Sequence, residues 1–237
     1  MCGTSTGRVE ELSLFFPMYN EERNISQAVE SALRVLPRVA DRFEIIIVDD
    51  GSRDHTGDIA DEMARSNPAV HVVHHPTNLG YGAALQSGIR ASHMDWIFYT
   101  DGDNQFDLEE MPLVLERRDG SDIVAGYRID RRDAPYRKAG AWLYNRAACL
   151  LFCLRMRDVD CAFKLFRASL VRSMPLKSTG ALIDVEILAR AKLSSARIRQ
   201  VGVHHFARRS GHATGFKPAV ILRAFRELFL LRRELHA

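Results

Sequence analysis

The chain has 237 residues, 46% of them hydrophobic and 27% charged, which is typical of a globular protein with a substantial core. Its net charge of +3 is small for this length and does not argue for a nucleic-acid partner. The 4 cysteines include no Cys-x-x-Cys pair and are too few for the disulfide framework of a secreted protein, so they fit a reducing compartment. Cys149 and Cys153 lie one helical turn apart in an apolar run, so we expect both thiols to be buried.

The amino-terminal segment carries no targeting signal that we recognise. Met1 to Val9 is small and polar and lacks the apolar centre of a signal peptide. The sequence contains no apolar run of about 18 residues, the length that would predict a membrane span. We therefore expect a cytoplasmic protein.

The first half of the chain alternates short apolar runs with helical patterns. A strand is expected at 12–16, stopped by Pro17, and the nearly all-apolar run 43–48 is typical of a strand buried on both faces of a parallel sheet. Such alternation indicates βαβ units, whose ligands bind outside the carboxyl ends of the strands. The other elements expected in this half are strands at 70–74, 96–99 and 122–125, and helices at 24–36, 56–66, 80–91 and 109–117.

After Arg128 the alternation of short strands and helices becomes less regular. The pattern predicts an apolar helix at 138–154, a strand at 163–166, a helix at 182–192, a strand at 198–203 and a basic amphipathic helix at 217–235. We therefore divide the chain into a tail at 1–11, one α/β domain with a mostly parallel sheet at 12–206, and a basic loop with the amphipathic helix at 207–237.

The most informative motif follows the strand expected at 96–99. Asp101 and Asp103 flank Gly102, and a glycine-containing turn lets both carboxylates converge on one point beyond the sheet. Two hard oxygen ligands at a strand end suit Mg²⁺ or Mn²⁺, which share their coordination with substrate phosphates. Aspartate and glycine are also ordinary turn formers, so an acidic turn without a metal is the alternative.

Three further polar motifs follow the other strands expected in this half. They are PMYNE at 17–21, VDDGSRDHT at 48–56 and NLGYGAA at 78–84. Because the carboxyl ends of parallel strands meet at one edge of a sheet, we expect the four motifs to line one cleft. Convergent polar groups of this kind predict a pocket that handles a nucleotide.

These motifs, in this order and spacing, resemble those of the family 2 glycosyltransferases, which have the GT-A fold. The resemblance runs from about Leu12 to Phe206 and is strongest to the polyprenyl-phosphate branch, of the dolichol-phosphate mannose synthase type. It implies an inverting, metal-dependent transfer of a sugar from a UDP- or GDP-sugar to a polyprenyl phosphate, with Mg²⁺ or Mn²⁺ as the cofactor.

The same resemblance assigns roles to residues on the donor side. Arg128, after the fifth strand, matches an arginine that binds phosphate, and Gly102 stands where the backbone must approach closely. The metal is expected to bind Asp101, Asp103 and Gln105. The donor nucleotide is expected to contact Pro17, Tyr19, Glu21, Val48 and Asp50, together with Asp101 and Gly102.

The acceptor side is expected in two later segments. Arg208 matches a phosphate-binding arginine of the family, whereas Thr214 stands where the mannose synthases have a lysine, for which Lys217 is a candidate substitute. A hydroxyl acceptor needs a general base, and Asp184 and Glu186 are the candidates, but a phosphate acceptor is already anionic and needs none. Glu186 matches the position kept in the lipid-phosphate branch, so we favour a phosphate acceptor. The catalytic residues expected from the resemblance are Asp103, Glu186 and Arg208.

Other interpretations stay open. One is transfer to a sugar or small-molecule hydroxyl, and another is a nucleotide-sugar-binding module without turnover, which the intact Asp101 and Asp103 pair disfavours. A nucleotidyltransferase would be expected to have a glycine-rich basic loop after the first strand, where this chain has PMYNE. The helix expected at 138–154 fits a bilayer surface, a core contact or the interface of a homo-oligomer equally well.

Overall fold

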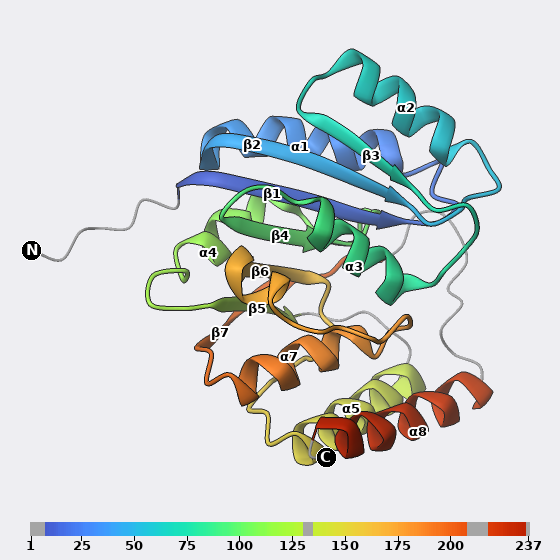
Figure 1. Cartoon of the computed structure of the whole chain (residues 1–237), viewed down its shortest axis with the longest axis vertical. Coiled ribbons are helices and arrows are strands. Elements are labelled where there is room, and N and C mark those ends of the chain that lie inside the picture. Colours follow the sequence, from blue (N-terminus) through green and yellow to red (C-terminus); the bar gives the residue numbers. More distant parts are fainter. Residues whose placement is uncertain (1–7, 130–134, 208–217, 236–237) are drawn as a thin grey trace, which may run out of the picture.

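The computed structural model describes residues 8–129, 135–207 and 218–235. Within these ranges one seven-stranded sheet has the strand order β3-β2-β1-β4-β6-β5-β7, with helices on both faces (Figure 1). The strands are β1 (Val9–Met18), β2 (Ala40–Asp49), β3 (Val70–His74), β4 (Trp96–Thr100), β5 (Ile123–Ile129), β6 (Phe163–Arg167) and β7 (Ile198–His204). The helices are α1 (Ile25–Val39), α2 (Thr56–Ser66), α3 (Tyr81–Ala91), α4 (Met111–Leu115), α5 (Pro135–Leu151), α6 (Ala168–Arg172), α7 (Ile183–Leu193) and α8 (Pro218–Leu235), and the 3₁₀ turn η1 (Leu108–Glu110) precedes α4.

The sheet is mostly parallel, as predicted, and β6 is its antiparallel member. It runs against both of its neighbours, β4 and β5, whereas all other pairs are parallel. The carboxyl ends of the other six strands therefore share one edge with the amino end of β6. The segment that enters β6, 158–162, consequently lies at the same edge as the polar motifs of the first half.

The expectation that Pro17 stops the first strand is wrong, because β1 continues to Met18 and Pro17 pairs with Val48 of β2. The Met18 carbonyl accepts a hydrogen bond from the Asp50 N–H, so the backbone of Pro17 faces the opposite side, toward β4. Pairing with β4 ends at Phe15. The missing N–H of Pro17 therefore falls where no partner strand remains, and it costs the sheet no hydrogen bond.

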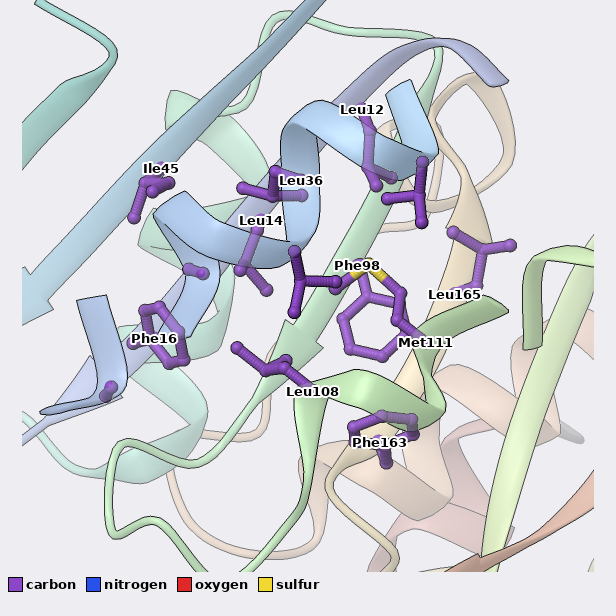
Figure 2. Packing of buried hydrophobic residues seen from close by; sticks show 14 of the residues in the cluster. Leu12, Leu14, Phe16, Leu36, Ile45, Phe98, Leu108, Met111, Phe163 and Leu165 are labelled. Carbon is purple, nitrogen blue, oxygen red and sulfur yellow. The ribbon is translucent and has the colours of Figure 1, made fainter. Parts of the chain in front are cut away.

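Two layers of apolar side chains hold the helices onto the sheet. On one face β1 and β4 pack against α1, α2 and α4, where Leu14 and Phe98 lie near Leu36 and Met111 (Figure 2). On the other face Phe15 and Tyr99 pack against α3, α6 and α7. A sheet covered on both faces explains why β1 and β2 are nearly continuous apolar runs.

A third cluster joins α5, α7 and α8 at the end of the molecule away from α2 (Figure 1). Phe152 and Leu228 are buried in it. The expectation of two buried thiols in this region is wrong, since Cys153 is exposed and Cys149 only half-buried. The helix ends at Leu151, and Cys153 adopts a positive φ of 52° in the turn that follows, which takes its side chain out of the helical register.

Candidate active site

The turn after β4 places the two predicted metal carboxylates at the shared strand edge. Gly102 lies in the middle of this turn, and a Cβ atom there would lie 2.6 Å from the Cε atom of Met18. A larger residue would therefore require the buried Met18 side chain or the turn itself to shift. Asn104 has a positive φ of 57°, and its side-chain amide donates to the Asn24 carbonyl, which fixes the turn to the start of α1.

The electrostatics of this turn fit a bound cation. Burial, then the nearby carboxylates of Asp103 and Asp184, raise the pKa of Asp101 to about 8. The Tyr81 hydroxyl donates a hydrogen bond to Asp101 and relieves only part of this crowding. A divalent cation between Asp101 and Asp103 would remove the repulsion. The described residues hold no cluster of three or more acidic, histidine or cysteine side chains arranged as a full metal site, so such a cation would complete its shell with substrate oxygens or water.

Gln105 connects this turn to the end of the last strand. Its side-chain amide donates to the Phe206 carbonyl at 2.8 Å, and its own carbonyl accepts the Phe206 N–H at 2.8 Å. The side-chain oxygen of Gln105 remains the atom that could bind a metal. The predicted metal turn and the chain leaving β7 are thus held together by two hydrogen bonds.

The loops after β1 and β2 are hydrogen-bonded to each other. Asn20, with a positive φ of 55°, accepts the Arg53 N–H at 2.8 Å, and its own N–H donates to Ser52 Oγ at 3.0 Å. The Glu21 N–H donates to Thr56 Oγ1 at 2.8 Å. Tyr19, next to these loops in the chain, is 39% exposed and therefore accessible to a ligand.

Asp50 is buried and organises the loop before α3. Its carboxylate accepts the N–H groups of Leu79 at 2.8 Å and Gly80 at 2.9 Å, and His75 Nδ1 lies 2.6 Å away. Gly80 has a φ of +100°, and a Cβ atom there would lie 2.5 Å from the Thr179 carbonyl oxygen. Only glycine fits this combination of backbone angle and close approach.

The amino end of α3 is capped by a loop from far along the chain. The Thr179 carbonyl accepts the N–H groups of Gly82 at 2.8 Å and Ala83 at 3.3 Å. Glu186, fully buried on α7, holds this loop because its carboxylate accepts the N–H groups of Lys177 and Ser178. Arg190 also donates to Glu186 at 2.8 Å. In this structure Glu186 contacts the loop and Arg190, so any influence on the reaction would pass through them.

A buried polar network lies beneath the metal turn. The ammonium of Lys164, the second residue of β6, donates to Asp184 Oδ1 at 2.6 Å, to the Cys161 carbonyl at 2.6 Å and to the Tyr99 hydroxyl at 3.1 Å. The Tyr99 hydroxyl also donates to Asp184. Burial, then the charge of Asp184, raise the pKa of Tyr99 well above its ordinary value, so it stays a neutral donor.

Arg128 lies at the same edge but already has an anionic partner. Its Nε and Nη2 donate to the two oxygens of Asp158 at 2.6 and 2.8 Å. Burial alone would lower the pKa of Arg128, but its hydrogen bonds to the Asp158 carboxylate outweigh burial and raise the pKa above its ordinary value. Its predicted contact with a substrate phosphate would therefore have to share the guanidinium with Asp158.

Asp160, two residues further along, has a buried oxygen, Oδ1, without a hydrogen-bond partner among the described residues. Burial, then the charges of Asp184 and Asp158, raise the pKa of Asp160 to about 7. Asp160, Lys164, Tyr99 and His75 were not among the residues expected at the site, and Tyr81 was expected there only as part of the motif at 78–84. Lys164 and Tyr99 could have been recognised in the sequence, because each is a polar side chain inside an otherwise apolar run.

The structure brings most of the predicted donor side together and leaves part of the acceptor side undescribed. Pro17 and Val48 are adjacent in the sheet and buried, and Asp50 and the Asp101 turn follow β2 and β4, the two strands that flank β1. Glu186 lies behind the loop that caps α3. Arg208, Thr214 and Lys217 lie outside the described residues.

Polar loops that gather at the carboxyl edge of a mostly parallel sheet, with an acidic turn suited to a divalent cation, are typical of nucleotide-sugar transferases. The chain belongs to glycosyl transferase family 2, because residues 13–177 match the model of that family. The fold is confirmed as GT-A by glucosyl-3-phosphoglycerate synthase from Mycobacterium tuberculosis, solved in complex with Mn²⁺, UDP and glucosyl-3-phosphoglycerate. It superposes with a TM-score of 0.69 at 21% identity, over 94% of this chain and 78% of the other.

Two curated relatives are similar in sequence. Dodecaprenyl-phosphate galacturonate synthase from Rhizobium johnstonii is 32% identical over 85% of this chain and 60% of its own length. Undecaprenyl-phosphate 4-deoxy-4-formamido-L-arabinose transferase from Pseudomonas paraeruginosa is 34% identical over 70% of this chain and 50% of its own length. The chain thus spans about half to three fifths of the length of these relatives.

Proposed function

We propose that this protein transfers a sugar, with inversion, from a nucleoside-diphosphate sugar to a polyprenyl phosphate. The observation that carries the proposal is the sequence similarity to the two relatives, which covers most of this chain. Both relatives are named as enzymes that use a polyprenyl phosphate. The family match supports the transfer itself.

On the donor side, Tyr19, Glu21 and Asp50 would receive the nucleoside, and Asp101, Asp103 and the Gln105 side chain would hold Mg²⁺ or Mn²⁺. The bound cation would neutralise the charge that develops on the leaving diphosphate. The hydrogen bond from Tyr81 and the Gly102 backbone keep the carboxylates in place. The crowding that raises the pKa of Asp101 supports a site built to receive positive charge.

On the acceptor side, neither base candidate from the sequence is free to act. Asp184 is buried and paired with Lys164, and Glu186 is buried and paired with backbone N–H groups and Arg190. A hydroxyl acceptor needs a base near the reacting carbon, whereas a phosphate does not. Because both carboxylates are buried and already paired, neither is placed to act as that base, which supports a phosphate acceptor. Arg208 stays a proposed ligand of that phosphate.

One observation favours the alternative of a hydroxyl acceptor. Asp160 has an unpartnered buried oxygen, and its pKa of about 7 would suit a general base. Replacing Asp160 by Asn would lower transfer to a hydroxyl at least about 100-fold but leave transfer to a phosphate within a few-fold, because only the former needs proton removal.

We also propose that the outward faces of α5 and α8 rest on the surface of the membrane that carries the lipid, on its cytoplasmic side. Large apolar side chains point outward on both helices, with Trp142 67% and Phe229 58% exposed. Arg146, Arg226 and Arg233 are exposed among them, and α5 contains no acidic residue. Apolar and basic side chains on one face suit anionic headgroups. No helix in the described ranges is long and apolar enough to cross a bilayer.

A donor screen tests the function. Nucleoside diphosphate release is measured for UDP- and GDP-sugars with Mn²⁺, in the presence and absence of undecaprenyl phosphate in detergent. The proposal predicts release that depends on the lipid and a glycolipid product whose anomeric configuration is inverted. Nucleoside diphosphate release that does not depend on the lipid would contradict the proposed acceptor. The absence of release from every donor would favour a nucleotide-sugar-binding module without turnover.

Sedimentation with vesicles tests the membrane contact. Vesicles that contain anionic lipid should retain the wild type more strongly than neutral vesicles do. Trp142→Ser should weaken retention about tenfold, whereas Leu113→Ser, at an exposed leucine on α4, should not. Equal retention of both variants would contradict this face as the contact.

A further inference from the structure

We propose that His75 is a positioning residue for the donor nucleotide, acting through Asp50. This inference rests on the proposed function, because it concerns the carboxylate assigned to the nucleoside. His75 follows β3 directly, and its side chain is only 7% exposed. It lies between the two structures that frame the donor site, the carboxyl end of β2 and the helix α3.

The two ring nitrogens of His75 have different partners. Nδ1 lies 2.6 Å from Asp50 Oδ1, and Nε2 lies 2.9 Å from Ser87 Oγ on α3. Because a carboxylate only accepts, Nδ1 carries the proton and donates to Asp50. In the neutral ring Nε2 then accepts from the Ser87 hydroxyl. The imidazole thus spans from β2 to α3 across the intervening loop.

Asp50 in turn fixes the backbone of that loop. Its two oxygens accept the N–H groups of Leu79 and Gly80, the residues immediately before α3. The loop is closely packed, because a Cβ atom on Gly51 would lie 2.3 Å from the Thr77 carbonyl carbon and one on Gly80 would lie 2.5 Å from the Thr179 carbonyl oxygen. A rotation of Asp50 would therefore break hydrogen bonds unless this packed loop also moved.

The same helix reaches the metal turn. Tyr81, the first residue of α3, donates a hydrogen bond to Asp101. Asp50 on the nucleoside side and Asp101 on the diphosphate side are thus held through the start of one helix. By donating to Asp50, His75 holds the rotamer of this carboxylate and so positions the group that binds the nucleoside end of the donor relative to the metal turn.

Substitution of His75 by asparagine or by glutamine separates the contact of Nδ1 with Asp50 from the contact of Nε2 with Ser87. Asn places an amide N–H near the position of Nδ1, and Gln places one near the position of Nε2. We expect His75→Asn to bind nucleotide almost as the wild type does. His75→Gln and His75→Ala should raise the dissociation constant about tenfold, because a hydrogen bond to a charged group is lost. His71→Gln, at an exposed histidine on the same strand, is the matched control.

The experiment measures the dissociation constants of UDP and GDP with Mn²⁺ by calorimetry, and the melting temperature of each variant. Where turnover is found, His75→Gln should raise the KM for the donor and leave kcat within about twofold. Equal affinities of the Asn and Gln variants, or a loss of affinity that merely follows the melting temperature, would overturn the inference. If the wild type binds neither nucleotide, the proposed function fails first and the role of His75 fails with it.

Discussion

The Lys164 ammonium lies 2.6 Å from Asp184 Oδ1 in the interior of the domain, where the two side chains are 1% and 4% exposed. Both charges are satisfied locally, since Lys164 also donates to the Cys161 carbonyl and to Tyr99. Replacing Lys164 by Met leaves the charge of Asp184 buried and unpaired. We expect this change to lower the free energy of unfolding by about 3–5 kcal/mol.

The double variant Lys164→Met, Asp184→Leu removes both charges and should recover most of that stability, because neither charge is then left unpaired. Urea denaturation of the wild type, the two single variants and the double variant gives the coupling energy. A Lys164→Met protein within about 1 kcal/mol of the wild type would show that the pair is dispensable for folding.

Replacing Asp101 in the acidic turn should have opposite effects on activity and on stability. Asp101→Asn and Asp103→Asn should each lower transfer at least about 100-fold, because a metal ion supplies several kcal/mol of transition-state stabilisation. The raised pKa of Asp101 means that folding favours its neutral form, so Asp101→Asn should keep or raise the melting temperature of the metal-free protein above pH 8. Asp119→Asn, at an exposed carboxylate, is the control for both measurements. Full activity of Asp101→Asn would contradict the metal site.

A substitution at Glu186 distinguishes a structural role, in which its carboxylate holds the loop at 177–180, from a role as the catalytic base. As an anchor of the loop at 177–180, its replacement by Gln breaks hydrogen bonds from Lys177, Ser178 or Arg190, and should cost about 2–3 kcal/mol of folding stability. The pH profile of kcat should keep its shape. A kcat that falls about 100-fold with an unchanged melting temperature would instead make Glu186 a catalytic base.

Glu44 should give the domain a measurable acid sensitivity. Burial alone would raise its pKa, but hydrogen bonds from Ser13 and His93 outweigh burial and hold the pKa below 4.5. The unfolded state therefore binds a proton more readily, and the stabilisation by Glu44 is present above pH 4.5 and lost as the pH falls through the lower, folded-state value. Glu44→Gln should flatten this part of the stability curve, followed by melting temperature from pH 3 to 6. Glu10→Gln, exposed on β1, should leave the curve unchanged.

The alternation of strands and helices could be predicted because each strand is a compact apolar run ended by a turn motif. The range 70–74 was right at both ends, and α3 differed from its expected range by one residue. The reversed direction of β6 could not be predicted, because the run from Phe163 to Phe166 has the same composition whichever way the strand points. The short helix α6 went unpredicted because its five residues show no helical period.

The candidate site divides in the same way. Asp101, Asp103 and Asp50 could be predicted because each directly follows a strand, and parallel strands bring their ends together. Asp160 and Lys164 became visible only when the antiparallel β6 brought its amino end to that edge. His75 carries no motif of its own, since its proposed role depends on a side-chain contact with Asp50, 25 residues earlier in the chain.

The capping of α3 by the Thr179 carbonyl determines where the negative charge of a diphosphate can be balanced. In dinucleotide-binding folds the free N–H groups at the start of such a helix receive the pyrophosphate. Here the N–H groups of Gly82 and Ala83 are already bonded to Thr179. The partial positive charge of this helix end is therefore already satisfied within the protein, and under the proposed function a bound diphosphate would have to be neutralised by a cation on the acidic turn and by basic side chains. An enzyme built this way should discriminate sharply against nucleotide binding in the absence of divalent metal.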